Sequence, residues 1–204
     1  MNPCKWHSES FTFRHPDGFV LKSASLQEAE DYLGAFREID PEVLKLTASP
    51  KMGDEKLIKE AYLRFCSDPD RAFFLLENPT GEILGEAVIN ELDRESAAAN
   101  FRIALFVQQA RNHGLGTWIT EQVCCYAFDV MRLETLSLDV LQNNPRARHV
   151  YEKTGFVHES FYEEETEDFT GNMQKLSFEQ MVLHKERWFL LHPTLSPNKE
   201  QKTM

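Results

Sequence analysis

A short polar segment rich in glycine, QQARNHGLGT (residues 108–117), contains residue types suited to ligand chemistry. It lies between an apolar run (101–107) and a strongly amphipathic stretch (118–131), which predicts a turn from a strand into a helix. The first N–H groups of a helix have no partner within it, and the helix dipole favours an anion there. Gly114 and Gly116 would let the backbone approach such an anion, and Arg111 could add a charge-assisted hydrogen bond. The segment is either a connecting turn or a cradle for phosphate.

Two common phosphate-binding patterns do not fit this segment. It lacks G-x-x-x-x-G-K-[ST], which disfavours a nucleotide triphosphatase, and it does not give G-x-G-x-x-G after a first strand, which disfavours a dinucleotide fold. What remains is R-x-x-G-x-G. On its own this pattern fits an ordinary turn better than a binding site.

A second segment, NNPRARHVYEKTGFV (143–157), follows after a strand-like run. It predicts a compact helix with Asn144 as N-cap, Pro145 at the first helical position and Gly155 just past the end. Together the two segments resemble the GNAT superfamily of acetyl-CoA-dependent N-acetyltransferases. They are most similar to the branch of spermidine and ribosomal-protein N-terminal acetyltransferases, although the loop lacks the usual proline and is one residue shorter. The second motif of the family corresponds here to Asn144, Ala147, Tyr151, Glu152, Lys153, Gly155 and Phe156.

This resemblance implies acetyl-CoA as the cofactor and assigns residues to it. The backbone at Leu105, Phe106 and Val107 is expected to contact the thioester and the pantetheine, and Asn144 is expected on the pantetheine side. The pyrophosphate is expected to bind mainly backbone N–H groups of the loop, with His113 contributing its backbone alone. The loop residues are Arg111, Asn112, His113, Gly114, Leu115, Gly116 and Thr117.

The resemblance also suggests the acid and the base of the reaction. Tyr151 holds the acid position of the family and would protonate the leaving thiolate, because a tyrosine with a pKa of about 10 still carries its proton at neutral pH. The amine is mostly protonated at pH 7, so a base must take a proton. Glu86 and Glu91 lie on predicted strands, and Asn100 occupies a strand where some relatives carry a glutamate. We name Glu91 as the candidate base.

The hydrophobic pattern predicts one α/β (α+β) domain over residues 19–190, with a mixed, mostly antiparallel central sheet flanked by helices. The resemblance implies that this sheet is of the GNAT type. Residues 1–18 form an extension that ends in the turn HPDG, and residues 191–204 a disordered tail. Helices are expected at 26–36, where Ser25 and Glu28 make a capping box, and at 57–65, 115–130 and 144–155. Strands are expected at 19–24, 71–77, 82–92, 97–107, 133–141, 156–165 and 173–183.

Composition limits the class of function. The formal net charge of −11 disfavours a nucleic-acid partner and permits a cationic ligand, while the acidic run at 163–168 is interpreted as solvated surface. No run is long enough to span a bilayer, and no signal peptide or C-x-x-C pair is present, so we expect a cytoplasmic protein with no membrane partner. The histidines show no metal-ligand spacing.

The acceptor of the acetyl group stays open at this point. The leading hypothesis is an acetyltransferase that acts on a primary amine of a small, polyamine-like cation or on a protein N-terminus, with a homo-oligomer allowed. The alternatives are a non-catalytic module that binds CoA or a protein partner on the same fold, and an acetyltransferase of the aminoglycoside type.

Overall fold

The computed structural model describes residues 10–48, 54–111, 113–168 and 171–193. Their centre is an eight-stranded sheet in the order β1-β2-β3-β4-β5-β6-β8-β7. Neighbouring strands are antiparallel except β5 and β6, so the predicted mixed, mostly antiparallel sheet is confirmed. The strands are β1 (Thr12–Arg14), β2 (Val20–Ser23), β3 (Ala72–Glu77), β4 (Ile83–Asp93), β5 (Ala98–Leu105), β6 (Thr135–Leu141), β7 (Val157–Glu167) and β8 (Met173–His184).

Helices cover both faces of this sheet. The α-helices are α1 (Ala29–Arg37), α2 (Pro41–Leu46), α3 (Glu55–Cys66), α4 (Leu115–Cys125), α5 (Pro145–Thr154) and α6 (Lys185–Leu191). Shorter helical turns are η2 (Leu26–Glu28), η3 (Gln108–Ala110) and the π-helical η4 (Tyr126–Val130). One apolar core, which includes Phe101 and Trp188, packs the sheet against α4, η4 and α6; the other, which includes Tyr32 and Phe106, packs it against α1, α2 and α3.

Local signals explain where several elements begin and end. The backbone N–H of Ser25 donates to Glu28 Oε2 (2.8 Å), which confirms the predicted capping box. At the start of α5, Asn144 Oδ1 accepts from the backbone N–H of Ala147 (3.1 Å). Gly155 ends that helix in the left-handed region at φ 112°, where a side chain would be strained. Both ends of the helix that carries Tyr151 are therefore as predicted.

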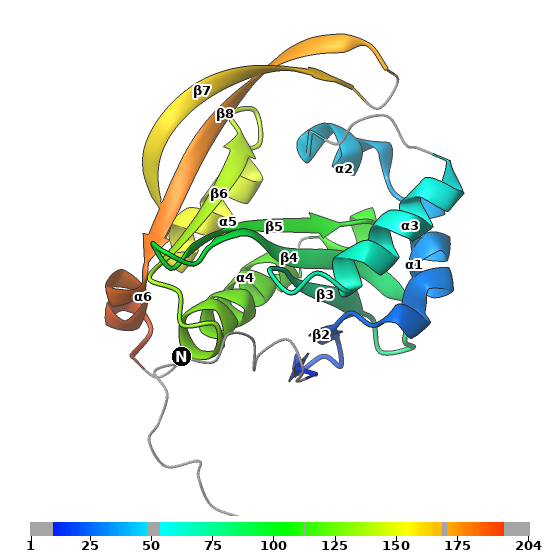
Figure 1. Cartoon of the computed structure of the whole chain (residues 1–204), viewed down its shortest axis with the longest axis horizontal. Coiled ribbons are helices and arrows are strands. Elements are labelled where there is room, and N and C mark those ends of the chain that lie inside the picture. The colour runs from blue at the N-terminus through cyan, green and yellow to red at the C-terminus, as the bar shows by residue number, and fades with distance from the viewer. Residues whose placement is uncertain (1–9, 49–53, 112, 169–170, 194–204) are drawn as a thin grey trace, which may run out of the picture.

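The pairing of β5 with β6 stops early and opens the sheet. Their parallel register runs only from Ala98↔Thr135 to Asn100↔Ser137. Beyond it, β5 pairs with β4, and β6 pairs with β8. In Figure 1 the long hairpin of β7 and β8 curves away from the rest of the sheet and reaches toward α2. Thus β5 and β6 diverge beside the helices α4 and α5, which carry the two sequence motifs and contact each other.

Three elements were not predicted. The strand β1 lies inside the predicted N-terminal extension and pairs with β2, which lies in the predicted domain. Phe11 and Phe13 pack against the first core. The helix α2 begins after Asp40, whose Oδ1 accepts from the backbone N–H of Glu42 (2.9 Å). At the other end, α6 continues to Leu191 and buries Trp188. Residues 1–9 and 194–204 of the predicted extension and tail lie outside the described residues.

Among the described residues, none of the helices combines the length and the apolar character that crossing a bilayer requires. A cytoplasmic location stays a prediction from the sequence.

Candidate active site

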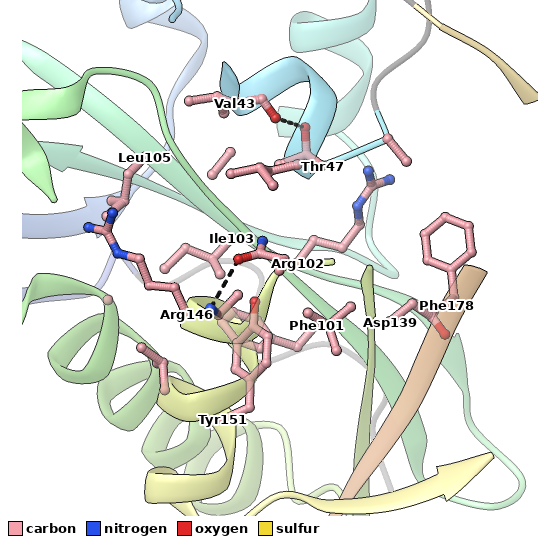
Figure 2. Close-up of a pocket in the computed structure, with 18 of the residues that line it drawn as sticks. Val43, Thr47, Phe101, Arg102, Ile103, Leu105, Asp139, Arg146, Tyr151 and Phe178 are labelled. Atoms are coloured by element: carbon pink, nitrogen blue, oxygen red, sulfur yellow. Dashed lines mark hydrogen bonds between the residues drawn. The ribbon is translucent and has the colours of Figure 1, made fainter. Parts of the chain in front are cut away.

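A cavity of about 510 Å³ lies where β5 and β6 diverge, a size typical of ligand pockets. Its walls come from α2, from β4 and β5, from β6, from the first turns of α4 and α5, and from the β7–β8 hairpin. Figure 2 shows Val43 and Thr47 on the α2 side and Tyr151 on the opposite side, with its hydroxyl directed into the cavity. The cavity thus joins both sequence motifs to elements far away in the chain.

Most of the predicted cofactor residues line this cavity. They are Leu105, Arg111, Gly114, Gly116, Thr117 and Asn144. Gly114 is the N-cap of α4 with φ 74°, a conformation that glycine adopts readily, and the nearest atom to a Cβ built on Gly116 would be Val150 Cγ2 at 3.8 Å. The backbone at the start of α4 is therefore not crowded at Gly114 or Gly116, and the N-terminus of a helix with such free space suits an anion.

The other predicted cofactor residues do not line the cavity. Phe106 is buried in the second core, Val107 packs against that core, and Leu115 is buried in the first. His113 is exposed beside the cavity-lining Gly114. Asn112 lies outside the described residues. The buried side chains are therefore not available to a ligand. The backbone N–H and carbonyl of Phe106 are also engaged, with the Leu84 carbonyl and the Asp40 N–H (both 2.8 Å).

Arg111 is held by carboxylates rather than left open for a ligand. Its Nη1 donates to Glu42 Oε2 (2.6 Å) and its Nη2 to Asp40 Oδ2 (3.1 Å), both at the start of α2. Its side chain is 8% exposed. The guanidinium therefore links the loop before α4 to α2.

Tyr151 combines a buried ring with a hydroxyl at the cavity. The ring packs edge-on against Phe101 and Phe156, with centroid distances of 6.5 and 6.0 Å. Burial raises the pKa of Tyr151 above its ordinary value. The phenol therefore keeps its proton at neutral pH, as an acid in the reaction must.

Carboxylates gather on other walls of the same cavity. Glu91 lies in the irregular part of β4, between Asn90 and Asp93, with φ 54°. Asp139 on β6 and Glu164 on β7 also line the cavity. Asp139 accepts from Asn100 Nδ2 (3.3 Å) and is hydrogen-bonded to Tyr162. Several carboxylates around one cavity favour a cationic ligand.

Glu86, the other glutamate considered from the sequence, lines the cavity as well. Its Oε2 accepts from the hydroxyl of Tyr32 at 2.7 Å. Burial raises the pKa of Glu86, although this hydrogen bond opposes the shift. Glu86 is thus engaged with α1, whereas Glu91 lies at the bulge of its strand.

Sequence reasoning missed a further group of lining residues. Arg146 lies in the first turn of α5, and Glu164 and Thr166 fall within the acidic run interpreted as solvated surface. That run forms part of β7, where alternate side chains face opposite sides of the strand. A strand prediction extended over 157–167 would have placed Tyr162, Glu164 and Thr166 on one face. The only sequence signal for α2, which forms another wall of the cavity, is the pair Asp40–Pro41, an N-cap residue followed by a proline at the first helical position.

The described chain resembles known spermidine acetyltransferases in sequence and in fold. Spermidine N(1)-acetyltransferase of Vibrio cholerae serotype O1 is 26% identical over 108 residues, which are 53% of this chain and 62% of that enzyme. The matched segment thus spans less than two thirds of that relative. A crystal structure of spermidine N-acetyltransferase from Vibrio cholerae in complex with CoA and spermine matches with a TM-score of 0.73 at 18% identity, covering 84% of this chain and 98% of that one.

A second solved structure from Vibrio cholerae is a dodecameric spermidine N-acetyltransferase in an intermediate state. It matches with a TM-score of 0.66 at 18% identity and covers 84% of this chain and 96% of that one. At these identities the structural matches establish the fold. The acetyltransferase (GNAT) domain family matches residues 19–157, which is more than half of the chain. The chain therefore belongs to the acetyltransferase (GNAT) domain family, whose members use acetyl-CoA.

Proposed function

We propose that the protein transfers the acetyl group of acetyl-CoA to a primary amine of a small, polyamine-like cation. The observation that carries this proposal is the charge around one cavity. The first turns of α4 and α5, with Arg146, line it together with the carboxylates Glu91, Asp139 and Glu164. The first set suits the phosphates of a CoA molecule, and the second suits ammonium groups.

In this proposal the loop from Arg111 to Thr117 holds the pyrophosphate through backbone N–H groups. Gly114 and Gly116 supply the close approach, and His113 contributes only its backbone. The backbone of Leu105 and Val107, at and after the end of β5, is assigned to the pantetheine and thioester side together with Asn144. Both backbone groups of Phe106 are paired within the protein. Asn112 completes the loop as a prediction from the sequence.

When bound, acetyl-CoA supplies an activated acyl group. Glu91 takes a proton from the acceptor ammonium, so that the neutral nitrogen can form the new N–C bond. As the C–S bond breaks, Tyr151 would give its proton to the leaving sulfur. The nitrogen of the new amide would lose its second proton to the Tyr151 phenolate through solvent, and Glu91 would release its proton to solvent, so that both groups return to their starting states. Tyr151 suits this role because its hydroxyl reaches the cavity while burial keeps it protonated.

Thiol release from acetyl-CoA, measured with a panel of amines, tests the proposal. We expect turnover with spermidine, and lower kcat/KM with aminoglycosides and with peptides that carry a free N-terminus. Preferred turnover with the peptides would contradict the polyamine assignment. If the protein binds CoA by calorimetry and no amine supports turnover, the chain is a binding module instead.

We also propose that the protein assembles into a homo-oligomer. The dodecameric spermidine N-acetyltransferase of the same fold supports this. Size-exclusion chromatography with light scattering measures the mass, and a mass of 23.7 kDa at micromolar concentration would contradict the proposal.

A further inference from the structure

The ion pairs of Arg111 connect two parts of the cavity wall that are far apart in sequence. Arg111 precedes the N-terminus of α4, whereas Asp40 and Glu42 begin α2. Both guanidinium contacts are hydrogen bonds, at 2.6 and 3.1 Å. A cation with so little exposure is stable only where its partners stay in place. The geometry therefore ties the position of α2 to Arg111.

Asp40 strengthens this connection because it serves α2 in a second way. One carboxylate oxygen caps the helix by accepting from the backbone N–H of Glu42 (2.9 Å), while the other accepts from Arg111. Its backbone N–H donates to the carbonyl of Phe106 (2.8 Å), just after β5. The first turn of α2 is thus attached both to the end of β5 and to the segment before α4.

The rest of α2 forms a wall of the cavity. Val43 and Leu46, with Thr47 and Ala48 after the helix, line it, while Val43 and Leu44 are buried against the second core. A six-residue helix is too short to be stable alone, so its contacts with the rest of the protein decide where it lies. Figure 2 shows Val43 and Thr47 across the cavity from Tyr151.

We propose that the side chain of Arg111 is a positioning residue, which docks α2 as the wall of the cavity that faces Tyr151. Only the backbone of Arg111 then belongs to the cofactor loop. Both Nη atoms of the guanidinium are engaged with carboxylates, and those carboxylates would repel a phosphate brought to the same group. The expected effect on turnover rests on the proposed function, whereas the effect on α2 does not.

Three substitutions that each remove one charge test this role. Arg111→Gln and Glu42→Gln break one or both ion pairs, and Asp40→Asn breaks one while it keeps a good N-cap oxygen. Glu55→Gln is the matched control, because it removes the exposed bidentate pair with Arg37 (2.7 Å), away from the cavity. Circular dichroism and a thermal melt confirm that each variant folds. Should Arg111→Gln fail to fold, the two substitutions on α2 carry the test.

Hydrogen exchange, calorimetry and kinetics give three independent results. We expect the amides of residues 42–48 to exchange about tenfold faster in all three variants and at the wild-type rate in the control. The Kd for CoA should stay within about twofold of wild type, while KM for the amine rises about tenfold. The double variant Arg111→Gln with Glu42→Gln should be no worse than the poorer single variant, because both remove the same contact.

The opposite pattern would overturn the proposal. If Arg111→Gln weakens CoA binding about tenfold, and amide exchange at 42–48 is unchanged in all three variants, Arg111 is a phosphate ligand. A wild-type protein that fails to acetylate any amine would contradict the proposed function instead. In that case the exchange rates of α2 still decide whether Arg111 docks this helix.

Discussion

The substitution Tyr151→Phe separates the chemistry of this residue from its packing. Phenylalanine keeps the edge-on contacts with Phe101 and Phe156, and the Tyr151 hydroxyl makes no hydrogen bond within the described parts of the chain. The free energy of unfolding should therefore change by less than about 1 kcal/mol. A positioned general acid contributes about 10²–10⁴-fold, so we expect kcat to fall by that factor, or about 2.7–5.5 kcal/mol in activation free energy.

The assay is thiol release at saturating acetyl-CoA and spermidine from pH 6 to pH 10. Burial holds the pKa of Tyr151 above its ordinary value, so the acid stays protonated and deprotonation of Tyr151 should not lower the wild-type kcat within this range. Tyr62→Phe is the control: its hydroxyl donates to the carbonyl of Ser25 (2.9 Å), so it should lose about 1 kcal/mol of stability and keep its kcat. A kcat of Tyr151→Phe within about threefold of wild type across the range would falsify the assignment.

Three further results are expected. Asp139→Asn should raise KM for spermidine about tenfold and leave KM for acetyl-CoA within about twofold; the reverse pattern in steady-state kinetics would place Asp139 on the cofactor side. Gly85→Ala should lower the free energy of unfolding by more than about 2 kcal/mol in urea titrations, since its Cβ would overlap the carbonyl oxygen of Ala104; an unchanged midpoint would contradict this overlap. Burial raises the pKa values of Tyr32 and Tyr62 in the folded protein, so above about pH 10 the unfolded chain loses these protons first. Thermal melts should therefore show that stability falls as the pH rises above about 10. Constant stability up to about pH 11 would refute this expectation.

Much of the fold could be predicted because its signals are local. The N-cap Asn144 and the left-handed Gly155 define α5, and the turn at 78–81 joins β3 to β4, with Gly81 N–H donating to the Asn78 carbonyl (3.0 Å). Such features depend on a few neighbouring residues. By contrast, β1 is three residues long and is held by its pairing with β2 and by Phe11 and Phe13 against the core. Its stability comes from contacts distant in sequence, which a local pattern does not contain.

The two sides of the site differ in the same way. In the loop, Gly114 has a left-handed backbone (φ 74°), which restricts the residue type there and makes the motif recognisable. The proposed acceptor side is built from separate side chains, such as Asp139 and Glu164, on strands that meet only in the folded sheet. An isolated acidic residue on a strand is equally typical of solvated surface. The cofactor could therefore be predicted from the sequence, while the charge of the acceptor side required the structure.

The short parallel register between β5 and β6 has a consequence for how such a site can change over time. The two strands are joined at only three paired positions, from Ala98↔Thr135 to Asn100↔Ser137. Beyond these positions, β5 is held by β4 and β6 is held by β8. The width of the opening is thus set by where one ladder stops, and not by any side chain within it. Mutation can then exchange the lining residues for a new acceptor while the gap itself is inherited unchanged.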